Sequence, residues 1–211
     1  MSVFALDNQP SRPGDAGRYV HSFNPIIESI GLENRVMSNH SGPKEYLVAA
    51  RSFDTSADEL AELSRSEYTF VRVAVAGNLK TKPEILHLMI PDKIEIESYP
   101  SQEIALQIAL NVNSSRDTLK LLGEKLLPCL KVGRGAYDAF RTGVVLCCNS
   151  LVPIQTIERM LKPENASRQF RKVVARESRR EDVLYLLLID QSEKVRKRAE
   201  TTLRAIKGSK P

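Results

Sequence analysis

One stretch of the sequence decides the fold: SRSEYTFVRVAVAGNLKTKPEILHLM, residues 64–89. Its apolar side chains recur at the three- and four-residue spacing of an amphipathic helix, first over residues 71–78 and again over residues 85–89. Gly77 and Asn78 separate the two runs, and both residue types tolerate left-handed backbone angles. Thr81 suits the N-cap of the second helix and Pro83 its first turn. The stretch therefore predicts two short helices joined by a tight break.

Weaker copies of this pattern follow one another along the chain. Segments that align with residues 76–86 begin at Ala50, Ala109, Cys147 and Val174, and a last half-unit begins at Val195. Neither helix of one unit can bury its apolar face alone, so neighbouring units must stack. The sequence thus predicts an all-α fold, a right-handed α-solenoid of about five irregular helical repeats over residues 44–207.

A resemblance to a known family follows from one of these units. The run VRxAVAxNxxTxPEIL, residues 71–86, resembles the leucine-rich repeat variant, a close relative of the HEAT-like repeats. The resemblance covers roughly Tyr46 to Leu203 and implies an architecture, not an activity. Some members of the variant family carry an N-terminal cysteine cluster for an iron–sulfur centre. Because no cysteine precedes Cys129 here, the resemblance carries over no such centre, and we predict no cofactor.

Segments outside the repeats are predicted to be irregular. Residues 1–43 contain four prolines and scattered Gly, Ser and Asn, which favours a flexible arm with one short capping helix over Pro25 to Met37. Residues 208–211 are predicted to be a disordered tail. Two loops, Ile90 to Glu103 and Pro128 to Asp138, are predicted to interrupt the array. Such loops either carry binding contacts or act as spacers.

The cysteines and the apolar runs indicate the cellular setting. An odd number of cysteines, Cys129, Cys147 and Cys148, makes a poor disulfide framework and favours a reducing compartment. The chain shows no signal-peptide pattern and no apolar run of the roughly 18 residues that a membrane span needs. We therefore predict a cytoplasmic protein without a membrane partner. Cys147 and Cys148 are expected to pack in a helix core, and a reactive thiol is the alternative.

Residue patterns for catalysis or metal binding are absent from the sequence. His21, His40 and His87 are isolated, and no paired Cys or His spacing indicates a metal site. The Gly133-Arg134-Gly135 turn lacks the spacing and the Lys-Ser/Thr pair of a phosphate loop. No nucleophile elbow is present either. We therefore expect no catalytic or metal-binding residues, and a chain that is not an enzyme.

Positive charge is concentrated at the C-terminal end. Residues 158–211 hold 15 Lys/Arg against 8 Asp/Glu, a net +7, whereas the rest of the chain holds 16 against 18, a net −2. Helical spacing over residues 168–176 and 194–207 predicts apolar stripes facing the core and basic residues facing solvent. The candidate residues for binding a polyanion or another partner are Arg168, Arg171, Lys172, Arg176, Arg179, Arg180, Lys194, Lys197, Arg198 and Arg204. The alternative is a solvated face on a polar capping repeat.

One arginine of this region is expected to be structural. Asp190 precedes Arg196 by six residues, the spacing at which HEAT-type repeats pair an aspartate of the turn with an arginine of the helix. We therefore expect Arg196 to pair with Asp190. Arg72 has Ser66 at the corresponding position, so a weaker pairing is expected there.

Three functions remain open at this point. We expect first a scaffold that binds a protein partner through one face of the stack, with nucleic-acid binding by the basic repeats as the alternative. A third is a DNA glycosylase, because HEAT-like stacks also build alkylpurine DNA glycosylases. That fold places aromatic side chains, including Trp, against the lesion. The chain has no Trp, which makes this the least favoured of the three.

Overall fold

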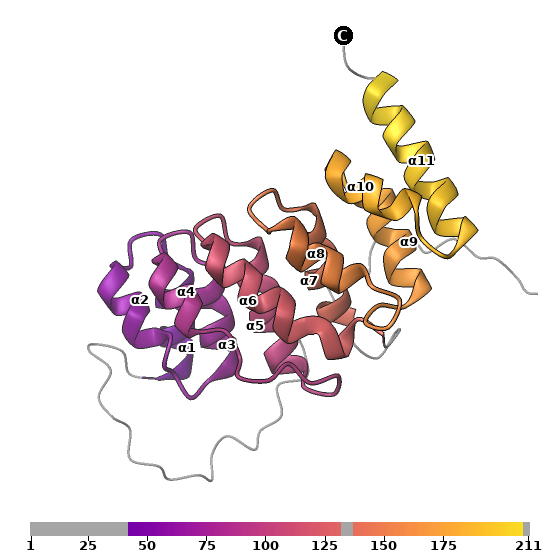
Figure 1. The fold of residues 1–211 in the computed structure, drawn as a ribbon. Helices are drawn as coiled ribbons and strands as arrows, with labels where there is room; N and C mark the ends of the chain where they lie inside the picture. Colours follow the sequence, from indigo (N-terminus) through magenta and orange to yellow (C-terminus); the bar gives the residue numbers. More distant parts are fainter. Residues whose placement is uncertain (1–41, 132–136, 209–211) are drawn as a thin grey trace, which may run out of the picture. The chain divides into compact units, whose positions relative to one another are not determined.

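The described part of the chain is entirely helical. A computed structural model describes residues 42–131 and 137–208, and within them it holds eleven α-helices, one short 3-10 helix and no strand (Figure 1). The predicted all-α class is confirmed. The helices are α1 Pro43–Arg51, α2 Ala57–Leu63, α3 Thr69–Gly77, α4 Pro83–Leu88, α5 Tyr99–Leu110, α6 Arg116–Leu126, the 3-10 helix η3 Leu127–Cys129, α7 Tyr137–Cys148, α8 Ile154–Leu161, α9 Arg168–Glu177, α10 Glu181–Leu188 and α11 Glu193–Gly208.

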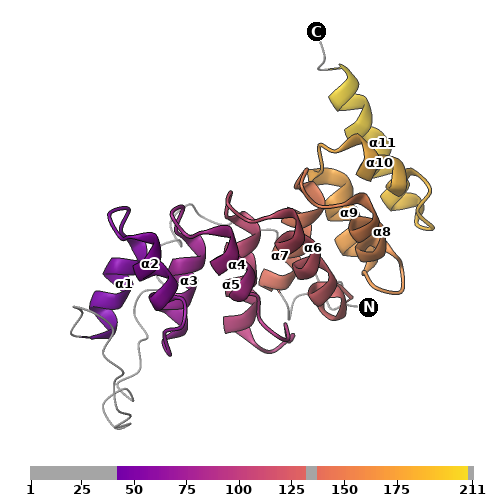
Figure 2. The same cartoon turned by 60° about the vertical axis from the view of Figure 1, so that its left-hand side comes forward.

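The helices pack in two series. Each odd-numbered helix packs against the next odd-numbered one, from α1 on α3 through to α9 on α11, and α4, α6, α8 and α10 form a similar series (Figure 2). Several odd and even helices that are consecutive in the chain also contact each other, most extensively α10 and α11. All described residues belong to one compact unit, residues 37–211.

Buried amides tie the end of one odd helix to the end of the one before it. The Asn78 Nδ2 after α3 donates to the carbonyls of Ala50 and Ser52 at 2.9 and 3.0 Å, at the end of α1. The Asn111 Nδ2 after α5 donates in the same way to the carbonyls of Ala76 and Asn78 at 2.8 and 3.0 Å. A buried carbonyl that lacks a hydrogen-bond donor destabilises the fold. Separating two consecutive turns would leave these carbonyls without their donors, so the bonds hold the turns beside one another.

Two details of the stretch over residues 64–89 differ from prediction. Asn78 has φ −75° and ψ 127°, which is extended and not left-handed backbone, so the helix ends because this amide bonds the neighbouring turn. Thr81 does not cap α4, whose N-cap is Lys82 without a side-chain bond. Its hydroxyl donates instead to the Val75 carbonyl of α3 at 2.6 Å. Equivalent hydroxyl bonds close α1 and α5, from Thr55 to Ala49 and from Ser114 to Ile108.

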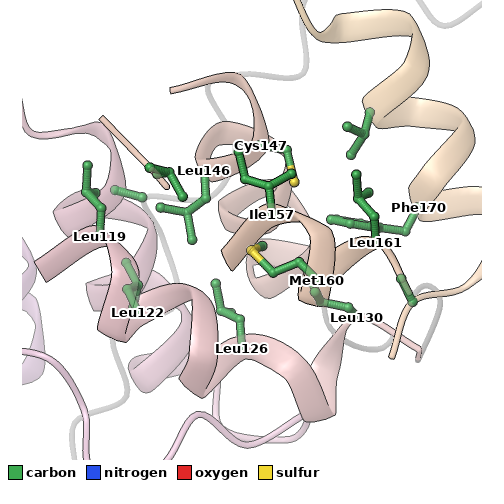
Figure 3. Packing of buried hydrophobic residues seen from close by; sticks show 14 of the residues in the cluster. Leu119, Leu122, Leu126, Leu130, Leu146, Cys147, Ile157, Met160, Leu161 and Phe170 are labelled. Carbon is green, nitrogen blue, oxygen red and sulfur yellow. The ribbon is translucent and has the colours of Figure 1, made fainter. Parts of the chain in front are cut away.

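Most of the apolar core runs without a break from Ala76 to Leu203, and a smaller cluster under α1, α2 and α3 completes it. Figure 3 shows the centre, where side chains of α6, α7, α8 and α9 meet. Phe170 is fully buried there and meets Phe140 edge-on, with ring centroids 5.3 Å apart. Gly143 lets α7 approach closely, because a Cβ at this residue would lie 2.7 Å from Leu130 Cδ2 and 2.8 Å from Phe170 Cε2.

The predicted loops were too long. Helix α5 begins at Tyr99, with Pro100 in its first turn, so the part of the first loop from Tyr99 to Glu103 is helical. Proline is tolerated there because the first-turn N–H groups have no helical partner anyway. In the second loop, Leu127–Cys129 is a 3-10 helix and α7 starts at Tyr137. Residues 1–41 of the predicted arm (residues 1–43), with its capping helix, lie outside the described residues, and Pro43 begins α1. Residues 132–136 and 209–211 also lie outside them, whereas Gly208, the first residue of the predicted tail, ends α11.

None of the helices in residues 42–131 and 137–208 combines the length and apolarity that crossing a bilayer requires. The cytoplasmic location stays a prediction.

Candidate partner-binding surfaces

Large apolar side chains are exposed at matching places on the turns after α1, α3 and α5. Each follows the residue that caps its helix: Phe53 is 67% exposed, Leu79 52% and Val112 76%. The amide bonds of Asn78 and Asn111 hold these three turns beside one another. The three side chains therefore form an apolar edge, and adjoining exposed apolar residues of this kind mark interaction sites.

A groove lies beside this edge, over the outward side of α3. It has a volume of ≈ 590 Å³, within the range of ligand-sized pockets. Its floor includes Ala74 and Gly77, and the small size of these two residues leaves the hollow open. Arg51 and Phe53 line it from the end of α1, and Glu103 and Gln107 line it from α5. The other lining residues are Phe70, Val73, Asn78 and Leu79.

The two charged side chains of the groove are opposite in sign and unpaired. Neither the guanidinium of Arg51 nor the carboxyl of Glu103 makes a hydrogen bond or an ion pair within the described residues. Partial burial raises the pKa of Glu103, and the nearby carboxylate of Asp138 raises it further. Asp138 is itself only loosely paired, 3.9 Å from Arg141. A cation supplied from outside would therefore stabilise the Glu103 carboxylate.

Arg171 is not on the surface. The prediction that it faces solvent is wrong, because the residue is 2% exposed and lies in a buried ion pair with Asp190, with Nε 2.6 Å from Oδ2. Its Nη1 also donates to the Ala166 carbonyl at 2.6 Å. Helical spacing alone could not reveal this, since Asp190 is 19 residues away and arrives from beyond α10. We remove Arg171 from the candidate binding residues.

Four of the remaining basic candidates lie near the surface but are paired with neighbouring carboxylates. These pairs are Arg176 with Glu177, Arg180 with Asp182, Lys197 with Glu193 and Arg204 with Glu200. Arg180 has a structural task as well, because its Nη1 donates to the carbonyls of Asn149 and Val152 at 2.6 and 2.8 Å. These four residues therefore add little unbalanced positive charge.

The other five candidates have no carboxylate partner in the described part of the chain. Four of them lie on α9 and α11, which pack against each other, and the fifth lies in the turn that follows α9. They are Arg168, Lys172, Arg179, Lys194 and Arg198. This smaller set carries the unbalanced charge of the C-terminal end.

Arg196 is structural, as expected, but through a different atom of Asp190. Its Nη1 donates to the Asp190 carbonyl at 2.7 Å, because Arg171 occupies the carboxylate. Arg72 bonds the carbonyl of Ser66 in the same way at 2.5 Å. Gln102 holds the same fourth position in α5 and donates to the carbonyl of Ile96 at 2.7 Å. These side chains satisfy carbonyls of the loops that lead into their helices.

The thiols have the character of core residues. Cys147 is fully buried and burial strongly raises its pKa, so the thiol stays protonated at neutral pH. Burial also raises the pKa of Cys129, whose Sγ lies 3.3 Å from the Ile94 carbonyl, and of the half-buried Cys148. A nucleophilic cysteine needs a lowered pKa. The reactive-thiol alternative therefore has no support among these residues.

Within residues 42–131 and 137–208, no three His, Cys, Asp or Glu residues gather closely enough to hold a metal ion. His87 has a structural partner, with Nδ1 3.1 Å from Thr118 Oγ1.

The apolar edge and the groove were not recognised in the sequence, although part of the signal was present. Phe53, Leu79 and Val112 each stand one residue after an aligned turn residue, where a polar residue is usual. The other wall of the groove was hidden, because Glu103 was assigned to a loop.

Comparison of the chain with protein-family models, with curated proteins and with solved structures finds no match in any of the three. The resemblance to the leucine-rich repeat variant therefore rests on the residues quoted above.

Proposed function

We propose that the protein is a non-catalytic scaffold that binds a protein partner at the groove over α3 and along the adjoining apolar edge. The observation that carries the proposal is the alignment of exposed Phe53, Leu79 and Val112 beside an open groove. Adjoining apolar surface of this kind is costly to leave in water and typical of protein interfaces. The residues that line the groove include no cysteine, histidine or serine that could serve as a nucleophile or as its base.

We further propose that the helices form a right-handed α-solenoid of about five HEAT-like repeats. The support is a turn that recurs after each of the helices α1, α3, α5, α7 and α9. In each of these turns the side-chain oxygen of one residue accepts a hydrogen bond from the backbone N–H of the residue two positions later. The accepting residues are Ser52, Asn78, Asn111, Asn149 and Ser178. In the alignment of the sequence repeats Arg176 corresponds to Asn78, but the equivalent turn is formed by Ser178, two residues later. The two series of helix contacts also suit such a stack.

Affinity capture from native lysate, with nuclease treatment, tests the protein-binding proposal. We expect the variant Phe53→Ser/Leu79→Ser to capture its nuclease-resistant protein partner at least about tenfold less well than the wild type, a loss of ~1.4 kcal/mol or more. The matched control is Leu88→Ser/Ile189→Ser, which removes two exposed apolar side chains elsewhere. Equal capture by both double variants would contradict the proposal.

A second candidate function, binding of nucleic acid, is favoured by the five cations that pair with no described carboxylate: Arg168, Lys172, Arg179, Lys194 and Arg198. Cations without protein partners are free to displace counterions from phosphates, and such binding weakens steeply with salt. This surface is separate in sequence from the groove.

Chromatography on heparin and binding to duplex DNA test the second candidate. We expect Arg168→Gln/Lys172→Gln/Arg198→Gln to elute from heparin at clearly lower salt than the wild type. The control Arg176→Gln/Lys197→Gln/Arg204→Gln changes the net charge equally, but its cations are already paired, so a smaller shift is expected. Absence of retention at about 50 mM salt, or an equal shift in both variants, would exclude this function.

A further inference from the structure

The groove over α3 has a charged residue on its α1 side and another on its α5 side, and most of the residues that line it on α3 are apolar. Arg51 comes from the end of α1, Glu103 comes from α5, and both helices pack against α3. Packed helices lie about 8–10 Å apart, so two spacings separate the axes of α1 and α5, across the groove, by roughly 16–20 Å. An extended chain covers that distance with about five or six residues.

The middle of the groove suits a closely approaching backbone. Ala74 and Gly77 present almost no side chain there, while Phe53, Phe70 and Leu79 offer apolar surface around them. A Cβ at Gly77 would lie 3.0 Å from Gln107 Oε1, so the Gln107 amide already borders the groove at this residue and a large side chain at position 77 would fill the space that remains.

Electrostatics fix the partner's charge at each end. Glu103 is partly buried, has no cation partner among residues 42–131 and 137–208, and lies near the carboxylate of Asp138. A basic side chain from a partner would offset both the desolvation of the Glu103 carboxylate and its repulsion by the Asp138 carboxylate. At the other end, Arg51 has no carboxylate partner in the part of the chain that the structure describes, so it would pair with an acidic side chain of a partner.

We propose that the occupant of the groove is an extended segment of a partner protein that carries an acidic residue against Arg51, apolar residues over Ala74 and Gly77, and a basic residue against Glu103. This inference rests on the proposed function and specifies the partner's chemistry. The segment needs about five or six residues, so a linear motif in a partner is sufficient.

Selection from a displayed library of random heptapeptides, with the full-length protein as bait, supplies the probe. We expect selected peptides to have an apolar centre flanked by one acidic and one basic residue. A synthetic copy of the best peptide should lose at least about tenfold in affinity for Glu103→Lys, and replacing its basic residue by Glu should restore the affinity. Arg51→Glu should show the same reversal with the peptide's acidic residue. Glu84→Lys, an exposed change of equal charge on α4, should have little effect.

The variant Gly77→Phe distinguishes partner binding at the groove from recognition of the partner's charges, because it fills the groove and leaves both charges in place. Suppose that Gly77→Phe abolishes peptide binding while Glu103→Lys and Arg51→Glu leave the peptide's affinity unchanged. That result would overturn the inference about partner chemistry and leave the proposed function standing. Binding that is unchanged in Gly77→Phe would overturn both. If the wild type instead forms a dimer that Gly77→Phe dissociates, as seen by analytical ultracentrifugation, the occupant is a second copy and the inference is wrong.

Discussion

We expect Arg171→Met to lower the free energy of unfolding by about 3–5 kcal/mol, because it leaves the buried Asp190 carboxylate without its counter-ion. In the native protein this carboxylate lies 2.6 Å from the Arg171 Nε and also accepts the Ser192 N–H at 2.7 Å. Both side chains of the pair are at most 5% exposed, so water cannot replace the lost partner. The Ala166 carbonyl would lose its hydrogen bond as well. Urea denaturation measures the change.

Two further variants make this prediction specific. Arg176→Met removes an exposed arginine paired with Glu177 on the same helix and should cost less than about 1 kcal/mol. Arg171→Met/Asp190→Leu replaces both buried charges with apolar groups and should recover most of the lost stability. If Arg171→Met costs no more than Arg176→Met, the buried pair is not what attaches α10 and α11 to α9.

The second large effect is expected at Phe170, where truncation to Ala should cost about 3–5 kcal/mol. The ring is fully buried between Phe140 and the close approach at Gly143. Removing it leaves a cavity in the centre of the core shown in Figure 3. Thermal and urea unfolding both report the loss.

Gly143 provides a sharper test of the same contact. Gly143→Ala alone should destabilise by about 1–3 kcal/mol, because the new Cβ would lie 2.7 and 2.8 Å from atoms of Leu130 and Phe170. In the Phe170→Ala background the clash with Phe170 is gone and the Leu130 side chain can shift into the cavity, so the cost of Gly143→Ala should be clearly smaller than in the wild type. Gly208→Ala, with nothing within 4 Å, is the matched control and should be close to neutral. Additive costs at Gly143 and Phe170 would contradict the contact.

Local signals in the sequence predicted the helices and much of the core. The spacing of Val71, Val75 and Leu86 predicted buried faces for α3 and α4, and all three are fully buried. These predictions succeed because periodicity and turn residues act over a few neighbouring positions. The predicted loop Ile90 to Glu103 extends too far because Pro100 lies in the first turn of α5, and proline both ends helices and begins them.

The surfaces were less predictable because they depend on contacts between segments distant in sequence. The helical pattern does not show that Arg171 is buried while Lys172 is nearer the surface. The difference arises because the fold brings Asp190 to Arg171, where the two form a buried ion pair. The groove required residues from α1, α3 and α5 together. Its apolar edge follows from Asn78 and Asn111, whose amides bond the preceding turn, a role that their spacing did not reveal.

Photo-cross-linking from the groove tests the central claim, partner binding over α3, most directly. A photoreactive phenylalanine replaces Leu79 in one full-length variant and the exposed Tyr185 of α10 in another, and both are irradiated in nuclease-treated native lysate. If a partner binds over α3, position 79 should give a discrete cross-linked protein that is absent from position 185 and disappears when Gly77→Phe is added. Cross-links of equal yield from both positions, or a product at position 79 that survives Gly77→Phe, would contradict it.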